Sequence, residues 1–376
     1  MTPLHDRKQW NALPTAEAEA LLMGVLQTQL PGFELKRFEC FSKFGMETYT
    51  MVLDRDGCEF VFVPGDTVTL GLDSWTFAPE NKEAMLEDGD GDEAALDQYI
   101  RERMSPVRTT TIGPMIVECA VRETGYFPVS LDDERLIKCN CLAEDLQSLQ
   151  DRGNKTHTLI RDRTYRLEKT PAGTQAFLYE PASYNELVAN VVCSGFRLPT
   201  EDEWEYLCGG GTRTLYPWGD SLDYTKNYGH FNLGFEDSLR EQAARLSPSS
   251  EKGKVIAYLL NHLDDLNSDE AMDIIEKARK DGWYDPYNEP PPFLETPNQF
   301  GLVIANDPYR YEVMMESDYF LKGGDGGGNC CGGACPDWSW LPTSTYFRDI
   351  SIFDEDLDYR NEITGDFTFV RRIIRL

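Results

Sequence analysis

The segment that most constrains the fold is GFRLPTEDEWEYLCGGGTRTLYPWGD, residues 195–220. Thr200 and, three residues later, Glu203 form a capping box, in which the two side chains reciprocally bind backbone N–H groups of the first helical turn. The sequence therefore predicts a helix that starts at Thr200. Gly209 to Gly211 supply the open or left-handed backbone that ends a helix, so the helix is about two turns long.

The spacing within this helix predicts its two faces. Trp204, Leu207 and Cys208 fall three and four residues apart, which places them together on one apolar face. The opposite face is expected to point to water and carries Glu201, Asp202 and Glu205. Acidic side chains beside the first turn also stabilise the positive end of the helix dipole. We interpret them as caps and solvent-facing groups, not as catalytic carboxylates.

The composition indicates an acidic globular protein. The chain has 376 residues, of which 41% are hydrophobic and 12% aromatic, enough for a sizeable core. Its 36 Lys and Arg residues stand against 65 Asp and Glu, giving a formal charge of −29. Because such a surface repels phosphate groups and anionic lipid headgroups, we expect no nucleic-acid or membrane partner. Basic proteins, cationic peptides and metal ions fit this charge better.

The N-terminal sequence and the cysteines suggest a cytoplasmic protein. MTPLHDRKQW is not followed by the apolar run of an export signal, and no stretch of about 18 apolar residues occurs in the chain. The ten cysteines are too sparse for a small disulfide scaffold, and several lie within apolar segments, as reduced buried cysteines do. A soluble protein in a reducing cytoplasm is the expectation.

Patterning along the chain predicts an extension and a main domain. Residues 1–57 are predicted to form a helix, near residues 15–30, and a hairpin that turns near Gly45. The main domain would span residues 58–376, with a closing C-terminal strand and insertions at about 79–111 and 235–292. Short strands and many turns indicate the α+β class.

Both insertions raise functional questions. DGDGDE, residues 88–93, suggests calcium, but a helix–loop–helix calcium site needs glycine sixth and glutamate twelfth, where this chain has Glu93 and Tyr99. We therefore predict a solvated acidic turn. The second insertion predicts helices near residues 254–266 and 269–280, followed by the aromatic, proline-rich DGWYDPYNEPPPF at 281–293. This stretch is expected to cover the domain or contact a partner.

RLPTEDEWEY (197–206) followed by YPWG (216–219) resembles the signature of the formylglycine-generating enzyme (sulfatase-modifying factor) family. Weaker matches follow the family's order at residues 60–71, 298–302, 321–327 and 371–376, so the resemblance covers about residues 58–376. The resemblance implies a C-type-lectin-like fold in a divergent member. The family's calcium-ligand segment is represented here by DPYRYEVM (307–314), so the resemblance gives no firm prediction of structural calcium.

The resemblance also points to the cysteines of LKGGDGGGNCCGGACPDWSW, residues 321–340. Catalytic family members bind copper(I) between two cysteines that are separated by four intervening residues, and use oxygen to convert a peptide cysteine to formylglycine. Cys330 and Cys335 have this separation, although Cys330 lies two residues farther from the double glycine than in the catalytic pattern. If the chain is an enzyme, these two residues are the expected catalytic and copper-binding groups.

Two alternatives to catalysis stay open for the same segment. Small adaptable residues interleaved with aromatics are typical of binding surfaces, so the segment can also bind a protein, a peptide or a small ligand without catalysis. The candidate ligand-binding residues are Asp325, Asn329, Cys331, Trp338, Trp340 and Tyr346. The other alternative is structural and includes a zinc site formed by Cys330, Cys331, Cys335 and one further ligand. We favour the binding role, with the copper-dependent oxidase as the alternative.

Overall fold

The structure is a computed structural model. It describes residues 2–89, 91–151, 157–161, 163–170, 173–226, 228–229, 240, 243–262, 273–274, 277, 292–317, 320–349, 363 and 367–376. The chain divides into two compact units, one formed by Met1–Ser221 with Pro297–Leu376 and the other by Leu222–Thr296. Helices and short, mainly antiparallel strands alternate throughout the first unit, which confirms the α+β class.

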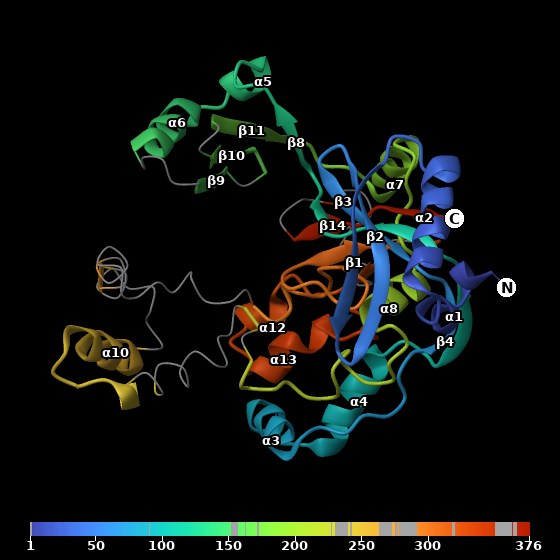
Figure 1. Cartoon of the computed structure of the whole chain (residues 1–376). Coiled ribbons are helices and arrows are strands. Elements are labelled where there is room, and N and C mark those ends of the chain that lie inside the picture. Colours follow the sequence, from blue (N-terminus) through green and yellow to red (C-terminus); the bar gives the residue numbers. More distant parts are fainter. Residues whose placement is uncertain are drawn as a thin grey trace. The chain divides into compact units, whose positions relative to one another are not determined.

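A five-stranded antiparallel sheet joins the beginning of the chain to its last residues (Figure 1). Its strands, in spatial order, are β1 (Glu34–Lys43), β2 (Met46–Arg55), β3 (Cys58–Val63), β6 (Met115–Glu118) and β15 (Ile373–Arg375). The predicted hairpin turns at Phe44 and Gly45, whose φ angles are both positive, as a tight two-residue hairpin turn requires. The predicted C-terminal strand is likewise confirmed as β15.

The predicted N-terminal helix is confirmed as α2 (Thr15–Gln29), preceded by α1 (Arg7–Asn11). Leu22 and Val25 of α2 belong to the same buried cluster as Phe60 and Phe62 of β3. The helix therefore covers one face of the sheet. The N-terminal hairpin joins the strands of the main domain in one sheet, because β2 pairs with β3.

The helix that starts after Thr200 is confirmed as α8 (Glu201–Gly209), with both halves of the capping box present. Gly210 closes it in the left-handed conformation, and Trp204, Leu207 and Cys208 are buried as predicted. The expected solvent face is wrong for two residues, because Glu201 is only 9% exposed and Glu205 is fully buried. Both carboxylates bind cationic side chains, which the helical pattern does not reveal.

Three smaller sheets complete the first unit. One consists of β8 (Tyr126–Val129), β11 (Gly173–Tyr179), β10 (Tyr165–Thr170) and β9 (His157–Arg161), with α5 (Glu134–Ile137) and α6 (Leu142–Asp151) packed on it around a separate core (Figure 1). Another consists of β13 (Leu321–Lys322), β12 (Tyr311–Val313), β14 (Thr368–Val370) and β7 (Arg122–Glu123). The last pairs β4 (Asp66–Leu70) with β5 (Arg108–Ile112).

The remaining helices lie in the two expected insertions, in the segment before α8 and near the C-terminus. They are α3 (Pro79–Asp88), α4 (Glu93–Arg103), α7 (Tyr184–Cys193), α10 (Glu251–Asn261), α12 (Gly328–Cys331) and α13 (Pro336–Trp340). Helix α10 overlaps the first helix predicted in the second insertion, whereas most of the second predicted helix and most of the aromatic stretch lie outside the described residues. Among the described residues, no helix has the length and apolarity needed to span a bilayer.

Candidate functional site

The candidate site begins directly after β13, at Gly323 and Gly324, and close packing favours glycine at both positions. Gly323 has a φ of +95°, and a Cβ there would lie 3.1 Å from the ring of Trp204. A Cβ at Gly324 would lie 2.5 Å from the carbonyl oxygen of Pro308. A side chain at Gly324 would collide with the backbone, and one at Gly323 would press on the Trp204 ring and would need a backbone angle that residues other than glycine rarely adopt. Helix α8 therefore supports this segment through the buried indole of Trp204.

Asp325 and Asn329, two candidate ligand contacts, fold the segment itself. The Asp325 carboxylate accepts hydrogen bonds from the backbone N–H groups of Gly327 at 2.9 Å and Asn329 at 3.1 Å. Burial raises the pKa of Asp325. The Asn329 side-chain amide donates to the carbonyl oxygen of Trp338 at 3.0 Å and so joins α12 to α13. These side chains therefore shape the turn between β13 and α13.

The three cysteines of the segment differ in exposure. Cys331 is exposed, and its sulfur lies 3.3 Å from the hydroxyl oxygen of Tyr309. Cys330 is half-buried with its thiol 3.7 Å from the carbonyl oxygen of Ser339, and burial together with nearby Asp325 raises its pKa to about 11. Burial also raises the pKa of the half-buried Cys335. The thiols of Cys330 and Cys335 are therefore protonated near neutral pH unless a metal ion or a base stabilises the thiolate.

The zinc alternative gains no support from the geometry. Among the residues that the structure describes, no group of three or more His, Cys, Asp or Glu side chains could hold a metal ion. The same finding covers the described part of DGDGDE, where the Asp92 carboxylate instead caps α4 by accepting from the N–H groups of Ala94 and Ala95. Copper(I) can be held by only two cysteine sulfurs, so this finding does not apply to it.

Two of the aromatic candidates must be corrected. Trp340 and Tyr346 are both fully buried, and the Tyr346 hydroxyl donates to the carbonyl oxygen of Thr212. A ligand at the surface cannot reach either ring. Trp338 is half-buried, donating its indole N–H to the carbonyl oxygen of Met85 at 3.0 Å while its ring meets Tyr99 edge-on. The alternation of aromatics with small residues here serves packing, which composition does not distinguish from display.

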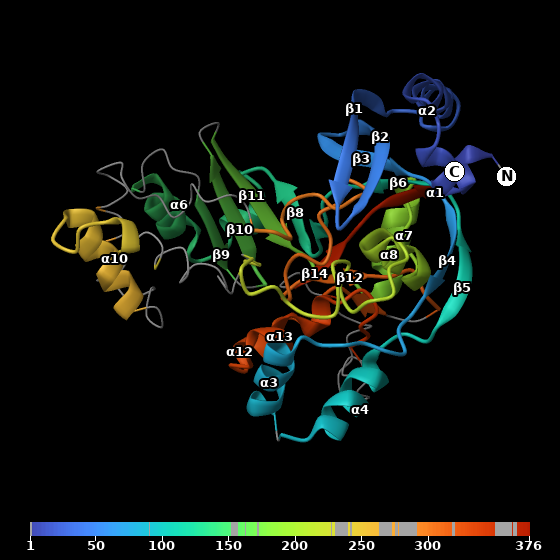
Figure 2. The same ribbon diagram turned by 60° about the horizontal axis from the view of Figure 1, so that its bottom comes forward.

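Helix α3, from the first insertion, holds the base of α13, and both views of the molecule show the two helices side by side (Figures 1 and 2). The Asn81 amide donates to the buried carboxylate of Asp337 at 2.7 Å. The Asp88 carboxylate accepts from the backbone N–H of Cys335 at 2.8 Å. The sequence offers no signal for this packing of α3 on α13, because the partners are far apart in the chain; Asn81 and Asp337 are separated by 256 residues.

A buried ion-pair network lies beneath the segment and explains the corrected face of α8. The Lys322 ammonium group, which is fully buried, lies 3.1 Å from Glu205 and 3.7 Å from Glu201. Arg108 also bonds Glu205, at 3.0 Å, and Arg348 binds Glu201 through two nitrogens. Burial raises the pKa of Glu205. These carboxylates join α8 to β13, β5 and the segment after α13, so their role is structural.

Comparison with known proteins finds a similar family for part of the chain. Residues 144–267 match the family described as "Sulfatase-modifying factor enzyme 1-like domain". This part of the chain is similar to a sulfatase-modifying factor domain. Domains of this family have the C-type-lectin-like fold, as the resemblance implied. The cysteine segment lies outside the matched residues, so this match does not bear on its chemistry.

Similar proteins include formylglycine-generating enzymes. The chain is 54% identical over 41 residues to those of Mus musculus and Bos taurus, covering 11% of this chain and 11% of each relative. It is 53% identical over 38 residues to that of Mycobacterium tuberculosis, covering 10% of this chain and 13% of the relative. The chain thus matches only about a tenth of the length of these relatives.

Proposed function

We propose that the chain is a binding member of this family and that residues 328–336, here called the cysteine loop, contact a peptide segment of another protein. One observation carries this proposal: small exposed residues stand on an immobilised base. Gly328, Cys331, Gly332 and Gly333 are exposed, whereas Asp337 and the residues from Ser339 to Phe347 are buried. Such a surface lets a partner backbone approach closely at a small cost in ordering the loop.

The charges around the cysteine loop favour a basic peptide. Asp88 bonds the backbone of Cys335, Asp325 folds the start of the loop, and Asp307 lies close enough to raise the pKa of the Cys330 thiol. Asp307 is paired with Arg310, whose Nε atom lies 3.1 Å from its carboxylate. Because the whole chain also carries a formal charge of −29, a positively charged partner is attracted at long range as well as at the loop.

The peptide proposal can be tested by selecting from a random peptide library displayed on phage. We expect the selected peptides to be enriched in Lys and Arg and to bind less tightly as salt is added. Gly328→Trp should abolish binding without strain, because a Cβ at Gly328 meets only Asp325, at 3.6 Å. Gly24→Trp is the matched control, since Gly24 is exposed on α2 with nothing within 4 Å of a Cβ. Peptides without basic residues, or binding that survives Gly328→Trp, would refute the proposal.

The copper-dependent oxidase is the second candidate, and the placement of two thiols favours it. Cys330 and Cys335 stand at the two ends of one tight turn, closed by the hydrogen bonds Gly333 N–H to Cys330 O and Ala334 N–H to Asn329 O. Two soft sulfur donors suit copper(I), so the residues present fit this metal ion. When bound, copper(I) supplies one-electron chemistry with oxygen. The contribution of the chain is to hold both sulfurs at the edge of the surface, where a peptide thiol can approach.

A copper(I) titration with a competing chelator separates the two candidates. If the oxidase candidate is correct, reduced wild-type protein binds one copper(I) tightly and Cys335→Ser loses this binding. Cys331→Ser, which removes an exposed thiol outside the pair, is the matched control and should still bind. A pure binding loop should take up no copper and should tolerate Cys335→Ser in the peptide assay.

All ten cysteines are free thiols in the structure, which fits the reducing cytoplasm that we propose as the compartment.

A further inference from the structure

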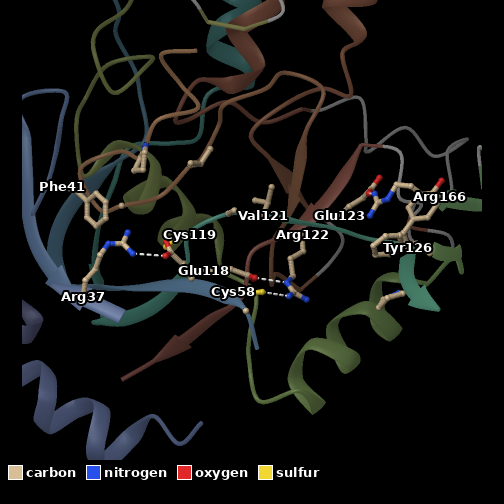
Figure 3. A pocket seen from close by; sticks show the side chains of 18 residues that line it. Arg37, Phe41, Cys58, Glu118, Cys119, Val121, Arg122, Glu123, Tyr126 and Arg166 are labelled. Atoms are coloured by element: carbon tan, nitrogen blue, oxygen red, sulfur yellow. Dashed lines mark hydrogen bonds and ion pairs between the residues drawn. The ribbon is translucent and has the colours of Figure 1, made fainter. Parts of the chain in front are cut away.

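A cavity of about 760 Å³ lies within the first unit, and it contains none of the residues of the cysteine loop (Figure 3). Its walls come from β1, the start of β3, the segment between β6 and β8, strands β10 and β11, and residues 297–303. Cavities of roughly 300–1,000 Å³ are typical of small-molecule sites in proteins. The volume is therefore sufficient for a ligand of one or two rings.

The cavity has apolar walls that suit a flat organic ligand. Phe41 lies on one side, with its ring held so close to Gly301 that a Cβ there would lie 2.6 Å from the ring. On the other side, the Arg166 guanidinium group lies 5.0 Å from the ring centre of Tyr126 and 4.6 Å from that of Phe177. Val121 adds an aliphatic wall between them (Figure 3).

Arg122 carries the positive charge that would select an anion. Its guanidinium group donates to the Glu118 carboxylate at 2.8 Å and to the Cys58 sulfur at 2.7 Å (Figure 3). Arg372 binds the same carboxylate through two nitrogens, at 2.8 and 2.7 Å. Two guanidinium groups therefore share one carboxylate, which leaves a positive charge in excess. The side chain of Arg122 is 46% exposed, so a ligand in the cavity can reach it.

The other arginines of the cavity are already balanced by carboxylates. Arg37 binds Glu59 and Glu39, and Arg166 binds Glu123 and Glu168. Arg122 is therefore the cation of this cavity that can pair with a ligand anion while Glu118 stays neutralised by Arg372. The excess positive charge is confined to the group of Arg122, Arg372 and Glu118, because Arg37 and Arg166 are each bound by two carboxylates.

We infer that this cavity binds a small organic anion with an aromatic body, such as an aromatic carboxylate or sulfonate. The anionic group pairs with Arg122, and the rings lie between Phe41 and the Tyr126–Phe177 wall. A planar guanidinium group binds carboxylates and sulfonates through paired N–H donors, which gives both strength and orientation. This site is independent of the proposed role of the cysteine loop.

Two fluorescent probes of nearly the same shape test the inference. Anilinonaphthalene sulfonate carries an anionic group, and phenylnaphthylamine is its neutral counterpart. We expect the sulfonate to bind at one saturable site about tenfold or more tightly than the neutral probe, as one charge-assisted contact provides. Benzoate should displace it. Equal binding of the two probes, or no binding of the sulfonate, would overturn the inference.

Variants then place the probe in the cavity. Arg122→Met should weaken sulfonate binding about tenfold and leave neutral-probe binding unchanged. Arg135→Met is the matched control, since Arg135 is an exposed, paired arginine outside the cavity. Val121→Trp should weaken binding of both probes by filling the cavity, and this variant remains decisive if Arg122→Met does not fold. Sulfonate affinity that is unchanged in Arg122→Met or in Val121→Trp would locate the probe elsewhere and refute the site.

Discussion

At the scale of single residues, the charged groups beneath the cysteine loop form buried ion pairs, although their spacing in the sequence suggests solvent-facing side chains. Glu205 and Lys322 are both fully buried, and their charged atoms are 3.1 Å apart. Removing one partner of such a pair leaves the other charge without full compensation, and this is more destabilising than the pair is stabilising.

We therefore expect Lys322→Met to lower the free energy of unfolding by about 3 kcal/mol, the lower end for breaking a buried pair because Arg108 still bonds Glu205. The double variant Lys322→Met with Glu205→Leu should recover part of this loss. Urea unfolding measures both. Arg213→Met, which removes an exposed pair with Asp73, serves as the control and should change stability by less than about 1 kcal/mol. An equally small effect of Lys322→Met would contradict the expectation.

Asp145 provides a pH-dependent prediction at the same scale. Hydrogen bonds from Arg161 and Tyr165 lower its pKa. A carboxyl group with a lowered pKa in the folded state stabilises the fold fully above its unfolded pKa, about 3.9, and loses this contribution as the pH falls further. Asp145→Asn should therefore reduce stability at pH 7 by about 2 kcal/mol, and the difference from wild type should narrow only below about pH 4. A difference that is independent of pH would show that the carboxylate charge is not involved.

At the scale of secondary-structure elements, α3 acts as a clamp on α13. The contacts are polar and specific: Asn81 with Asp337, the Met85 carbonyl with Trp338, and Asp88 with the backbone of Cys335. We expect Asn81→Ala to increase hydrogen exchange of backbone amides in residues 328–340 severalfold, with little change in the five-stranded sheet. Lys82→Ala, at the neighbouring position on α3, should leave that exchange unchanged because Lys82 pairs with Glu93. Unchanged exchange in Asn81→Ala would mean that α3 does not restrain the loop.

The elements show what the sequence could predict. Residues that act locally were interpreted correctly: the capping box of α8, the terminating glycines, the N-terminal helix and the hairpin turn all depend on neighbours within a few positions. The faces of elements were predicted less well. Glu205 lies 117 residues before its partner Lys322 in the sequence. Helical spacing alone therefore places the Glu205 side chain on the solvent-facing side of α8. Trp340 and Tyr346 were misassigned for the same reason, because nothing local distinguishes a buried aromatic from a displayed one.

At the scale of the whole molecule, the charge imbalance sets the response to salt. With 65 acidic and 36 basic residues, like charges repel across the compact fold, and salt screens this repulsion over distances beyond about 10 Å at 0.1 M. We expect the melting temperature to rise by about 3 °C between low salt and about 0.5 M sodium chloride. Potassium and tetramethylammonium chlorides should act equally. A rise with one cation only would point to a specific cation site instead of screening.

The position of β15 in the first sheet has a consequence for how the protein is made. Ile373 pairs with Val117, and Val61 lies on the opposite side of that same residue. On a translating ribosome, β6 is synthesised well before the strand that will cover its free side. Until then, the backbone N–H and C=O groups along that side of β6 are open to pairing with other chains. The nascent protein therefore passes through an aggregation-prone interval that lasts until Ile373 to Arg375 have been synthesised and can pair with β6, and chaperone dependence should be greatest in that interval.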